Sequence, residues 1–372
     1  MRKIILLALL WAASNLVAEK PMNVIFILAD DLGWSDTELY GTTRYYKTPN
    51  INRLAERGML FTRAYANSPL CSPTRASILT GQTPLRHGST APNHHIAGEA
   101  KLRAAESPTG PLFQKATPPQ SANRLDTAWP TLAKLIQAKG YATGHFGKWH
   151  LGMEPYSPLE HGFDVDIPHY PGPGPKQFFV GNWNYPNLKA RHPKENIEDR
   201  MAEEAVKWMK SVKDQPFYLN YWAFSVHGPW DSHKHLVEHY KKTLDPNDEQ
   251  RAPTYAAMIH VFDDAVGVLL DAVDELGIAD HTAFVFTSDN GGNMYNTIDG
   301  GVPPTSNRPL RGGKATEWEG GVRVPCAVVW PGLTDAGSRS DTVIQSCDFY
   351  PTILKLLDIP LPEQWPVDGA DL

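Results

Sequence analysis

Short apolar runs that end abruptly in acidic residues recur along the chain. Residues 23–29 (Asn-Val-Ile-Phe-Ile-Leu-Ala) form a continuous, β-branched run, which is typical of a strand buried on both faces. This run stops at Asp30 and Asp31, and a similar run at residues 283–287 stops shortly before Asp289. The pattern predicts buried strands with acids at their carboxyl ends. Further apolar runs of strand length cover residues 141–146, 217–224 and 325–330.

Helical patterns lie between these runs. Residues 197–212 and 262–276 each carry an apolar stripe with a period of about 3.6 residues. Residues 48–58 and 127–139 begin at a threonine with a proline close behind, and a glycine ends or follows each segment. Strands alternating with helices predict an α/β fold with a mostly parallel central sheet flanked by helices. Ligands bind beyond the carboxyl ends of such strands, so we expect the acids to converge on one edge.

Two long stretches have no periodicity. They cover residues 91–124 and 168–193, and the second is rich in proline, glycine and aromatic residues. Loops of this length inside a compact domain are usually functional or disordered. We expect residues 168–193 to shape a substrate site.

Composition narrows the class of protein. The chain has 372 residues, with 35 Lys+Arg against 41 Asp+Glu, which gives a formal net charge of −6. This length allows about two domains, or one large α/β domain with a smaller companion. The mild acidity argues against a nucleic-acid partner, which needs a basic surface. After the first residues, no apolar run approaches the ~20 residues of a membrane span, which excludes a polytopic membrane protein.

The first 18 residues have the pattern of a secretory signal peptide. Arg2 and Lys3 precede an apolar run over residues 4–13, and small and polar residues follow up to Ala18. The alternative is a short membrane anchor, but the run is too short to span a bilayer well. We therefore expect export, with a secreted or periplasmic mature protein that begins at residue 19.

The cysteine count is odd for an exported protein. Cys326 and Cys347 could form a disulfide, which leaves Cys71 as the spare thiol. The alternative for Cys71 is a buried and inert thiol. Ser72, Thr74 and Arg75 make that segment more polar than an ordinary core position.

The acids at the two strand ends have the chemistry of a metal site. Asp30, Asp31 and Asp289 offer carboxylates and Asn290 offers an amide oxygen, which suit Ca²⁺ or Mg²⁺ rather than Zn²⁺. Either pair alone could simply cap a helix or turn. Together at one sheet edge, the three acids would repel one another without a cation. The sequence therefore predicts a divalent metal site.

A second motif begins at Cys71. The segment Cys-Ser-Pro-Thr-Arg continues as Ala-Ser-Ile-Leu-Thr-Gly, and Pro73 suits the first turn of a helix that runs towards Gly81. Cys71 would then lie at a helix N-terminus, where backbone N–H groups favour an anion. Arg75, one turn further on, would point back to the same place. The arrangement suits an anionic substrate group or an activated nucleophile.

Four basic side chains complete the candidate site. Lys148 and His150 follow an apolar run, His227 follows another, and Lys314 lies in a glycine-rich turn. Each alone is more often a solvated surface residue. Together with a metal they meet the needs of a reaction that neutralises a tetrahedral oxyanion and protonates a leaving oxygen.

The order of these blocks resembles that of a type I sulfatase of the alkaline phosphatase-like superfamily. The resemblance covers most of the chain after residue 18, and its most specific motif is Cys-x-Pro-x-Arg followed by Ala-Ser-Ile-Leu-Thr-Gly. The matching blocks are Asp30-Asp31, Cys71-x-Pro-x-Arg75, Gly-Lys148-Trp-His150-Leu-Gly, His227-x-Pro, Asp289-Asn290-Gly and Gly-Gly-Lys314.

The resemblance implies a modified nucleophile. A formylglycine-generating maturation enzyme would convert Cys71 to Cα-formylglycine, whose hydrate attacks sulfur with one hydroxyl and expels sulfate with the help of the other. The resemblance also implies that Ca²⁺, with Mg²⁺ as the alternative, is held by residue 71 and the acids. The implied metal ligands are Asp30, Asp31, Cys71, Asp289 and Asn290.

The other roles follow from the same resemblance. Arg75 and His150 would orient and activate residue 71, Lys148 and Lys314 would bind the sulfate oxygens, and His227 would help to protonate the departing alcohol. The expected activity is hydrolysis of a sulfated small molecule or glycan. The alternatives are a phosphate or phosphonate ester hydrolase of the same superfamily and a non-catalytic sulfoglycan-binding protein.

The carboxyl end departs from the family pattern. Family members usually continue beyond a segment like residues 368–372 into a small antiparallel sheet with a helix. We therefore expect residues 19–372 to form a sulfatase catalytic domain that lacks most of this subdomain. Residues 165–175 match no known specificity loop, so the resemblance identifies no particular sugar.

Overall fold

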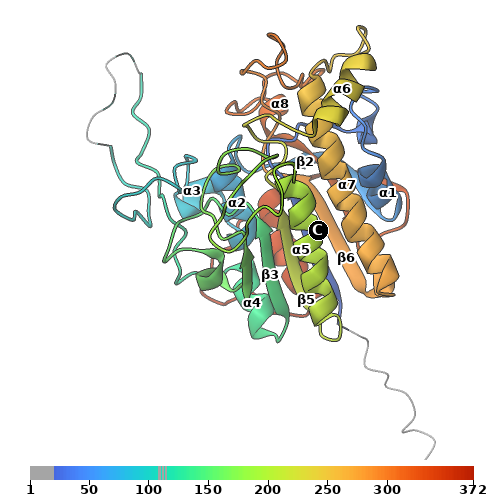
Figure 1. Cartoon of the computed structure of the whole chain (residues 1–372). Helices are drawn as coiled ribbons and strands as arrows, with labels where there is room; N and C mark the ends of the chain where they lie inside the picture. The colour runs from blue at the N-terminus through green and yellow to red at the C-terminus, as the bar shows by residue number, and fades with distance from the viewer. Residues whose placement is uncertain (1–20, 108–109, 111–112, 114) are drawn as a thin grey trace, which may run out of the picture.

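A computed structural model describes residues 21–107, 110, 113 and 115–372 (Figure 1). These residues build one eight-stranded sheet in which β7 runs antiparallel to both of its neighbours and every other neighbouring pair is parallel. The predicted α/β fold with a mostly parallel sheet is confirmed. In sheet order the strands are β4 (Val165–Ile167), β3 (Ala142–Gly147), β5 (Phe217–Trp222), β1 (Asn23–Ala29), β6 (Thr282–Ser288), β7 (Arg323–Val329), β2 (Met59–Tyr65) and β8 (Ser338–Gln345).

Helices cover both faces of this sheet (Figure 1). One face packs against α1 (Pro49–Glu56), α5 (Ile197–Val212) and α7 (Pro253–Glu275), and α6 (Lys234–Lys242) lies against α7. The opposite face packs against α2 (Cys71–Thr80), α4 (Leu132–Ala138) and α9 (Phe349–Leu356). Two single-turn helices, α3 (Pro84–His87) and α8 (Glu319–Val322), lie in the connecting segments.

The central strand β1 explains why the sheet needs both layers. Its residues are buried throughout, and alternate side chains enter two separate apolar clusters. Ile25 and Ile27 belong to the cluster under α7, whereas Phe26 belongs to the cluster under α9. Burying one such side chain contributes roughly 1.5–3 kcal/mol. The two helical layers are therefore both needed to bury the side chains of β1.

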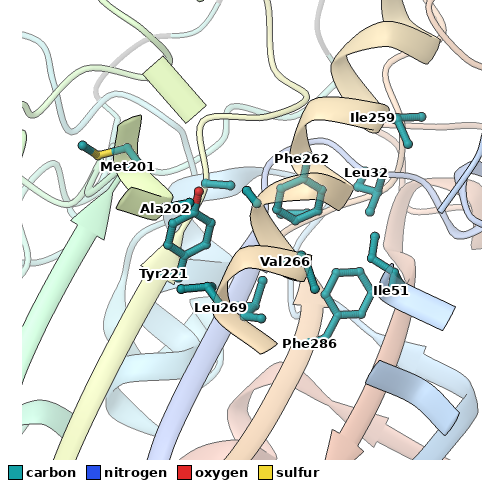
Figure 2. Packing of buried hydrophobic residues seen from close by; sticks show 14 of the residues in the cluster. Leu32, Ile51, Met201, Ala202, Tyr221, Ile259, Phe262, Val266, Leu269 and Phe286 are labelled. Atoms are coloured by element: carbon teal, nitrogen blue, oxygen red, sulfur yellow. The ribbon is translucent and has the colours of Figure 1, made fainter. Parts of the chain in front are cut away.

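Figure 2 shows the packing under α7 from close by. Phe262 and Val266 of α7 point at the sheet, and the Phe262 ring lies 6.4 Å from the ring of Phe286 on β6, centroid to centroid. Tyr221 of β5 and Leu269 of α7 complete this layer. The apolar stripe predicted over residues 262–276 is thus the buried face of α7, although the helix begins earlier, at Pro253.

Four parallel strands bring the motif residues to one edge of the sheet. β3, β5, β1 and β6 are adjacent, so their carboxyl ends lie together. The residues that follow these ends include Lys148 after β3, His227 after β5, Asp30 after β1 and Asp289 after β6. Long-range strand pairing therefore assembles a site from segments far apart in the sequence.

Several sequence expectations differ from the structure. The helix expected over residues 127–139 covers only Leu132–Ala138, because residues 127–129 form a turn before the Thr131 side chain caps the helix. Cys326 and Cys347 form no disulfide; both thiols are free and buried. The signal peptide expected at residues 1–18 lies outside the described residues. In the part of the chain that the structure describes, no helix is long and apolar enough to cross a membrane.

Candidate active site

Cys71 is the first residue of α2, as the sequence predicts. The whole helix is buried, and Cys71 is only 2% exposed. The polar residues that argued against a core position are accommodated by hydrogen bonds. Ser72 Oγ donates to the backbone oxygen of His150 at 2.8 Å, and Thr74 Oγ1 donates to the backbone oxygen of Ser68 at 3.0 Å. The segment is therefore a buried polar element at the sheet edge.

Arg75 links α2 to two strand ends. Its Nε and Nη2 donate to Asp289 Oδ2 at 2.9 and 2.8 Å, and its Nη1 donates to the backbone oxygen of Lys148 at 2.7 Å. Burial lowers the pKa of Arg75, but Asp289 and Asp30 outweigh it and raise that pKa above its usual value. The guanidinium thus remains a buried cation that fixes Asp289.

The two neighbouring acids after β1 have different lysine partners. Lys148 Nζ donates to Asp30 Oδ2 at 2.6 Å, and Lys314 Nζ donates to Asp31 Oδ2 at 2.7 Å. Asn290 Nδ2 donates to the other oxygen of Asp31 at 2.8 Å. The backbone at Asp31 is left-handed, with φ of 64°, and one oxygen of Asp31 lies within 4.8 Å of one oxygen of Asp30. Asp30 and Asp31, although adjacent in sequence, thus form two separate ion pairs.

Burial and charge act differently on these two carboxyl groups. Burial raises the pKa of Asp30 well above its usual value, and Lys148 only partly offsets this. Burial also raises the pKa of Asp31, but Lys314 and His227 outweigh it and hold that pKa below its usual value. Asp30 is therefore the carboxyl group that has most to gain from another cation.

The residues present fit a divalent ion. Asp30 Oδ1 and Asn290 Oδ1 are buried and have no hydrogen-bond partner among the described residues. One ligand atom from each of Asp30, Cys71 and Asp289 lies within 4.8 Å of the others. Unpartnered buried oxygens beside carboxylates suit a hard cation such as Ca²⁺ or Mg²⁺. These residues, with Asp31 nearby, could hold such an ion.

Asp30, Asp31, Cys71, Asp289 and Asn290 form a buried cup, and two histidines face it. His150 Nδ1 lies 3.3 Å from Cys71 Sγ of α2, and the backbone of His150 is left-handed, with φ of 57°. His227 Nδ1 lies 2.7 Å from the backbone oxygen of Gly228, which can only accept, so Nδ1 carries the proton. His227 Nε2 then faces Asp31 Oδ2 at 3.8 Å. Burial lowers the pKa of His227 to about 4; Lys314 acts in the same direction, and Asp31 acts against it. This imidazole is therefore neutral at pH 7.

The aperiodic stretch at residues 168–193 packs against one of these histidines. A Cβ atom added to Gly174 would lie 2.9 Å from His227 Nδ1 and 2.8 Å from the backbone oxygen of Gly228. Such distances leave no room for a side chain at this position. The loop therefore reaches the cup and borders His227.

The structure brings together all the site residues predicted from sequence, through direct contacts or ion pairs. It also adds His95, which the sequence analysis missed. His95 Nδ1 lies 2.9 Å from His150 Nε2, and His95 comes from the other aperiodic stretch, residues 91–124. Two consecutive histidines, His94 and His95, were the only hint in the sequence. Because the surrounding loop has no periodicity, the sequence could not predict where their side chains lie in the fold.

Comparisons with known proteins agree with this geometry. A family model described as Sulfatase matches residues 22–359. The chain is 32% identical over 375 residues to human N-acetylgalactosamine-6-sulfatase, which covers 95% of this chain and 66% of that protein. It is 30% identical to human steryl-sulfatase, covering 99% of this chain and 71% of that protein. The chain thus spans about two thirds of the length of these curated relatives.

A solved structure has the same fold. The crystal structure of Ps i-CgsB in complex with k-i-k-neocarrahexaose superposes with a TM-score of 0.78 at 26% identity. The similarity covers 95% of this chain and 75% of that one.

Proposed function

Because the chain belongs to the sulfatase family, we propose that it hydrolyses a sulfate ester, converting ROSO₃⁻ and water to ROH and HSO₄⁻. The observation that carries the proposal is the position of Cys71. It lies at the start of α2, beside His150 and within reach of the Asp30 and Asp289 carboxylates. A nucleophile, a base and a hard-cation site thus share one buried cup.

The charges of the cup suit a monoanionic ester. Three carboxylates (Asp30, Asp31 and Asp289) are matched by three cations (Arg75, Lys148 and Lys314) through the ion pairs described above. A divalent ion bound by the carboxylates would leave the cup with a surplus of positive charge. That surplus favours an anionic substrate and the additional negative charge of its transition state.

Two groups supplied from outside complete the chemistry. As a formylglycine hydrate, residue 71 would supply one hydroxyl that displaces the alcohol from sulfur and a second whose deprotonation expels sulfate. A divalent ion, Ca²⁺ or Mg²⁺, would polarise a sulfate oxygen and would be held by Asp30, Asp31, Asp289, Asn290 and residue 71.

The remaining side chains have separate tasks. Lys148 and Lys314 neutralise the sulfate oxygens, and Arg75 holds Asp289 in place. His150 faces residue 71 and takes up its hydroxyl proton. His227 faces the departing alcohol; the negative charge of a bound sulfate ester raises the pKa of His227, which lets it deliver a proton there. Loop 168–193 encloses the alcohol side.

We further propose that the alcohol is a carbohydrate and that the protein is exported. Human N-acetylgalactosamine-6-sulfatase is named for a sugar sulfate and the structure of Ps i-CgsB is of a complex with a neocarrahexaose, whereas human steryl-sulfatase is named for a sterol. The leader at residues 1–18 directs secretion or transfer to the periplasm, where residues 19–372 form the catalytic domain. A formylglycine-generating enzyme is the maturation partner.

The test uses protein co-expressed with a formylglycine-generating enzyme. Intact-protein and peptide mass spectrometry measures the conversion of Cys71, and turnover is compared on matched aryl sulfate and aryl phosphate esters. We expect converted protein to release sulfate faster than phosphate, and a Cys71→Ala control to release neither. Faster phosphate release would identify a phosphoester hydrolase. Converted protein that binds sulfated oligosaccharides without turnover would identify a binding protein; either result rejects the proposal.

A further inference from the structure

His95 contacts the active-site histidine from the side opposite to residue 71. His95 Nδ1 lies 2.9 Å from His150 Nε2, while His150 Nδ1 lies 3.3 Å from Cys71 Sγ. The two rings are tilted by 43°, with their centroids 5.0 Å apart. Both nitrogens of the His150 imidazole are therefore engaged, one by the nucleophile position and the other by His95.

The backbone that carries His95 is held independently of its side chain. Arg124 Nη1 donates to the backbone oxygen of His94 and Arg124 Nη2 donates to that of Ile96, both at 2.9 Å. His94 itself is buried and contacts Ser89. A change of the His95 side chain thus leaves the path of residues 94–96 in place.

The backbone of His150 does not fix the orientation of its ring. Its backbone oxygen accepts a hydrogen bond from Ser72, but rotation about χ2 of a histidine is broad and roughly two-fold. A half-turn of the ring would replace both nitrogens by carbons at their present contacts. The only ring contact opposite residue 71 that our structure gives, within the described residues, is the one to His95.

We propose that His95 is a positioning residue for His150: it accepts the proton of His150 Nε2–H, fixes the ring, and leaves His150 Nδ1 free to accept from residue 71. Two ring nitrogens 2.9 Å apart share one proton, and the hydrogen bond at one nitrogen of a histidine sets the state of the other. The consequence for catalysis rests on the proposed function, in which residue 71 carries a hydroxyl that needs an acceptor. The direction of the His150–His95 hydrogen bond rests on the same function, whereas the tautomer itself is measured without activity.

The first test reads the proton directly and needs no activity. Protein with unmodified Cys71 is labelled with ¹⁵N-histidine, and two-bond ¹H–¹⁵N correlations identify the tautomer of each ring. His150→Gln assigns the His150 signals. We expect His150 to be the Nε2–H tautomer in the native protein and to become a mixture in His95→Leu. An Nδ1–H tautomer in the native protein overturns the proposal.

The second test separates positioning from a general structural role. Asparagine can place Oδ1 near the position of His95 Nδ1, whereas leucine removes the acceptor. With formylglycine-containing protein, we expect His95→Leu to lower kcat by about 10–100-fold with KM within about 2-fold, and His95→Asn to recover most of kcat. Ile96→Ala, at an exposed neighbouring side chain, is the control and keeps the native kcat.

Equal loss in the leucine and asparagine variants, or a change confined to KM, rejects the role of His95. If His95→Leu fails to fold, the native tautomer and the asparagine variant still decide. If the native protein releases no sulfate, the proposed function fails, and the tautomer result stands separately.

Discussion

Asp31 and Asp36 are both buried aspartates five residues apart, but their surroundings differ completely. Asp31 faces the Lys314 cation and the His227 ring, and its pKa lies below the usual value. Asp36 lies in a cage of neutral polar groups: Gly33 N and Tyr255 Oη contact one carboxyl oxygen at 2.7 and 3.0 Å. Burial raises the pKa of Asp36 to about 7 in spite of these hydrogen bonds.

The comparison shows what burial of an acid achieves in each place. The Asp36 cage is completed by Thr305 and Gln250, which contact the other carboxyl oxygen, so the group is satisfied without an ion. The cup around Asp31 instead concentrates opposite charges and leaves oxygens of Asp30 and Asn290 unpartnered. A neutral cage stabilises a loop, whereas a charged cup with unused ligands is suited to binding and chemistry.

Tyr255 connects the two regions. Its hydroxyl lies 3.1 Å from the backbone oxygen of Asp31 and 3.0 Å from Asp36 Oδ2. One phenol proton cannot be donated to both acceptors. A protonated Asp36 resolves this, because its carboxyl group donates to Tyr255 while Tyr255 donates to Asp31. The raised pKa of Asp36 agrees with that arrangement.

The largest effect is expected from Asp31→Asn. This substitution removes the partner of Lys314 and an expected ligand of the ion, so we expect sulfate release to fall by about 10²–10³-fold. Steady-state kinetics on an aryl sulfate measures the loss, with the circular dichroism spectrum as the folding check. The matched control is Asp36→Asn, which we expect to keep kcat within about 3-fold. Similar losses of activity in both variants would remove the distinction between cup and cage.

A smaller effect is expected in the pH dependence of stability. Between the unfolded pKa of about 3.9 and the folded pKa of about 7, Asp36 holds a proton that the unfolded chain has released. The free energy of unfolding therefore falls as pH rises through this window and levels off above pH 7. The Asp36→Asn variant has no carboxyl group at this position and does not show this fall. The difference in the free energy of unfolding, variant minus native protein, should therefore rise by about 2–3 kcal/mol from pH 5 to pH 8.

Urea denaturation of both proteins at the two pH values measures this difference, and the other titrating groups cancel in the subtraction. A constant difference between the two proteins would mean that Asp36 is ionised throughout, like an ordinary carboxylate.

The smallest effect is expected from Tyr255→Phe. Loss of the hydroxyl leaves the Asp31 backbone oxygen and Asp36 short of one hydrogen bond, which should lower the free energy of unfolding by about 1–3 kcal/mol. We expect kcat to change by less than about 3-fold, because the Asp31 side chain keeps its contacts with Lys314 and Asn290. Chemical denaturation and aryl sulfate kinetics measure the two effects. An unchanged unfolding midpoint would show that the hydroxyl does not bridge the two regions.

The fold could be predicted where burial leaves a pattern in the sequence. The central strand β1 is apolar throughout, so its position and its terminal acids were evident. The edge strand β8 (Ser338–Gln345) was missed because most of its side chains are polar and exposed. β2 was also missed, since its interior is interrupted by Thr62 and Arg63. Pairing with β7 decides the position of β2, and such long-range contacts leave no local signal.

The site could be predicted only where residue chemistry and strand ends coincide. Asp30 and Asp289 follow buried strands, and Cys71 begins a helix with an evident start. His95 and Asp36 carry no such signal, because a loop path selects their partners. The polar segment around Cys71 did not suggest a buried position. It is buried because hydrogen bonds to other parts of the fold satisfy its hydroxyl groups.

The order of strands has a consequence for how this protein is made. β1 is paired on both sides, with β5 and with β6, and Asn23 contacts Thr282 across 259 residues of sequence. A chain emerging from the ribosome exposes its first strand long before that neighbour exists. Non-local pairings of this kind form slowly and leave apolar surface exposed to aggregation. Nascent chains that have not yet reached β6 therefore expose one edge of β1, and Asp30 meets Asp289 only after that strand has been made.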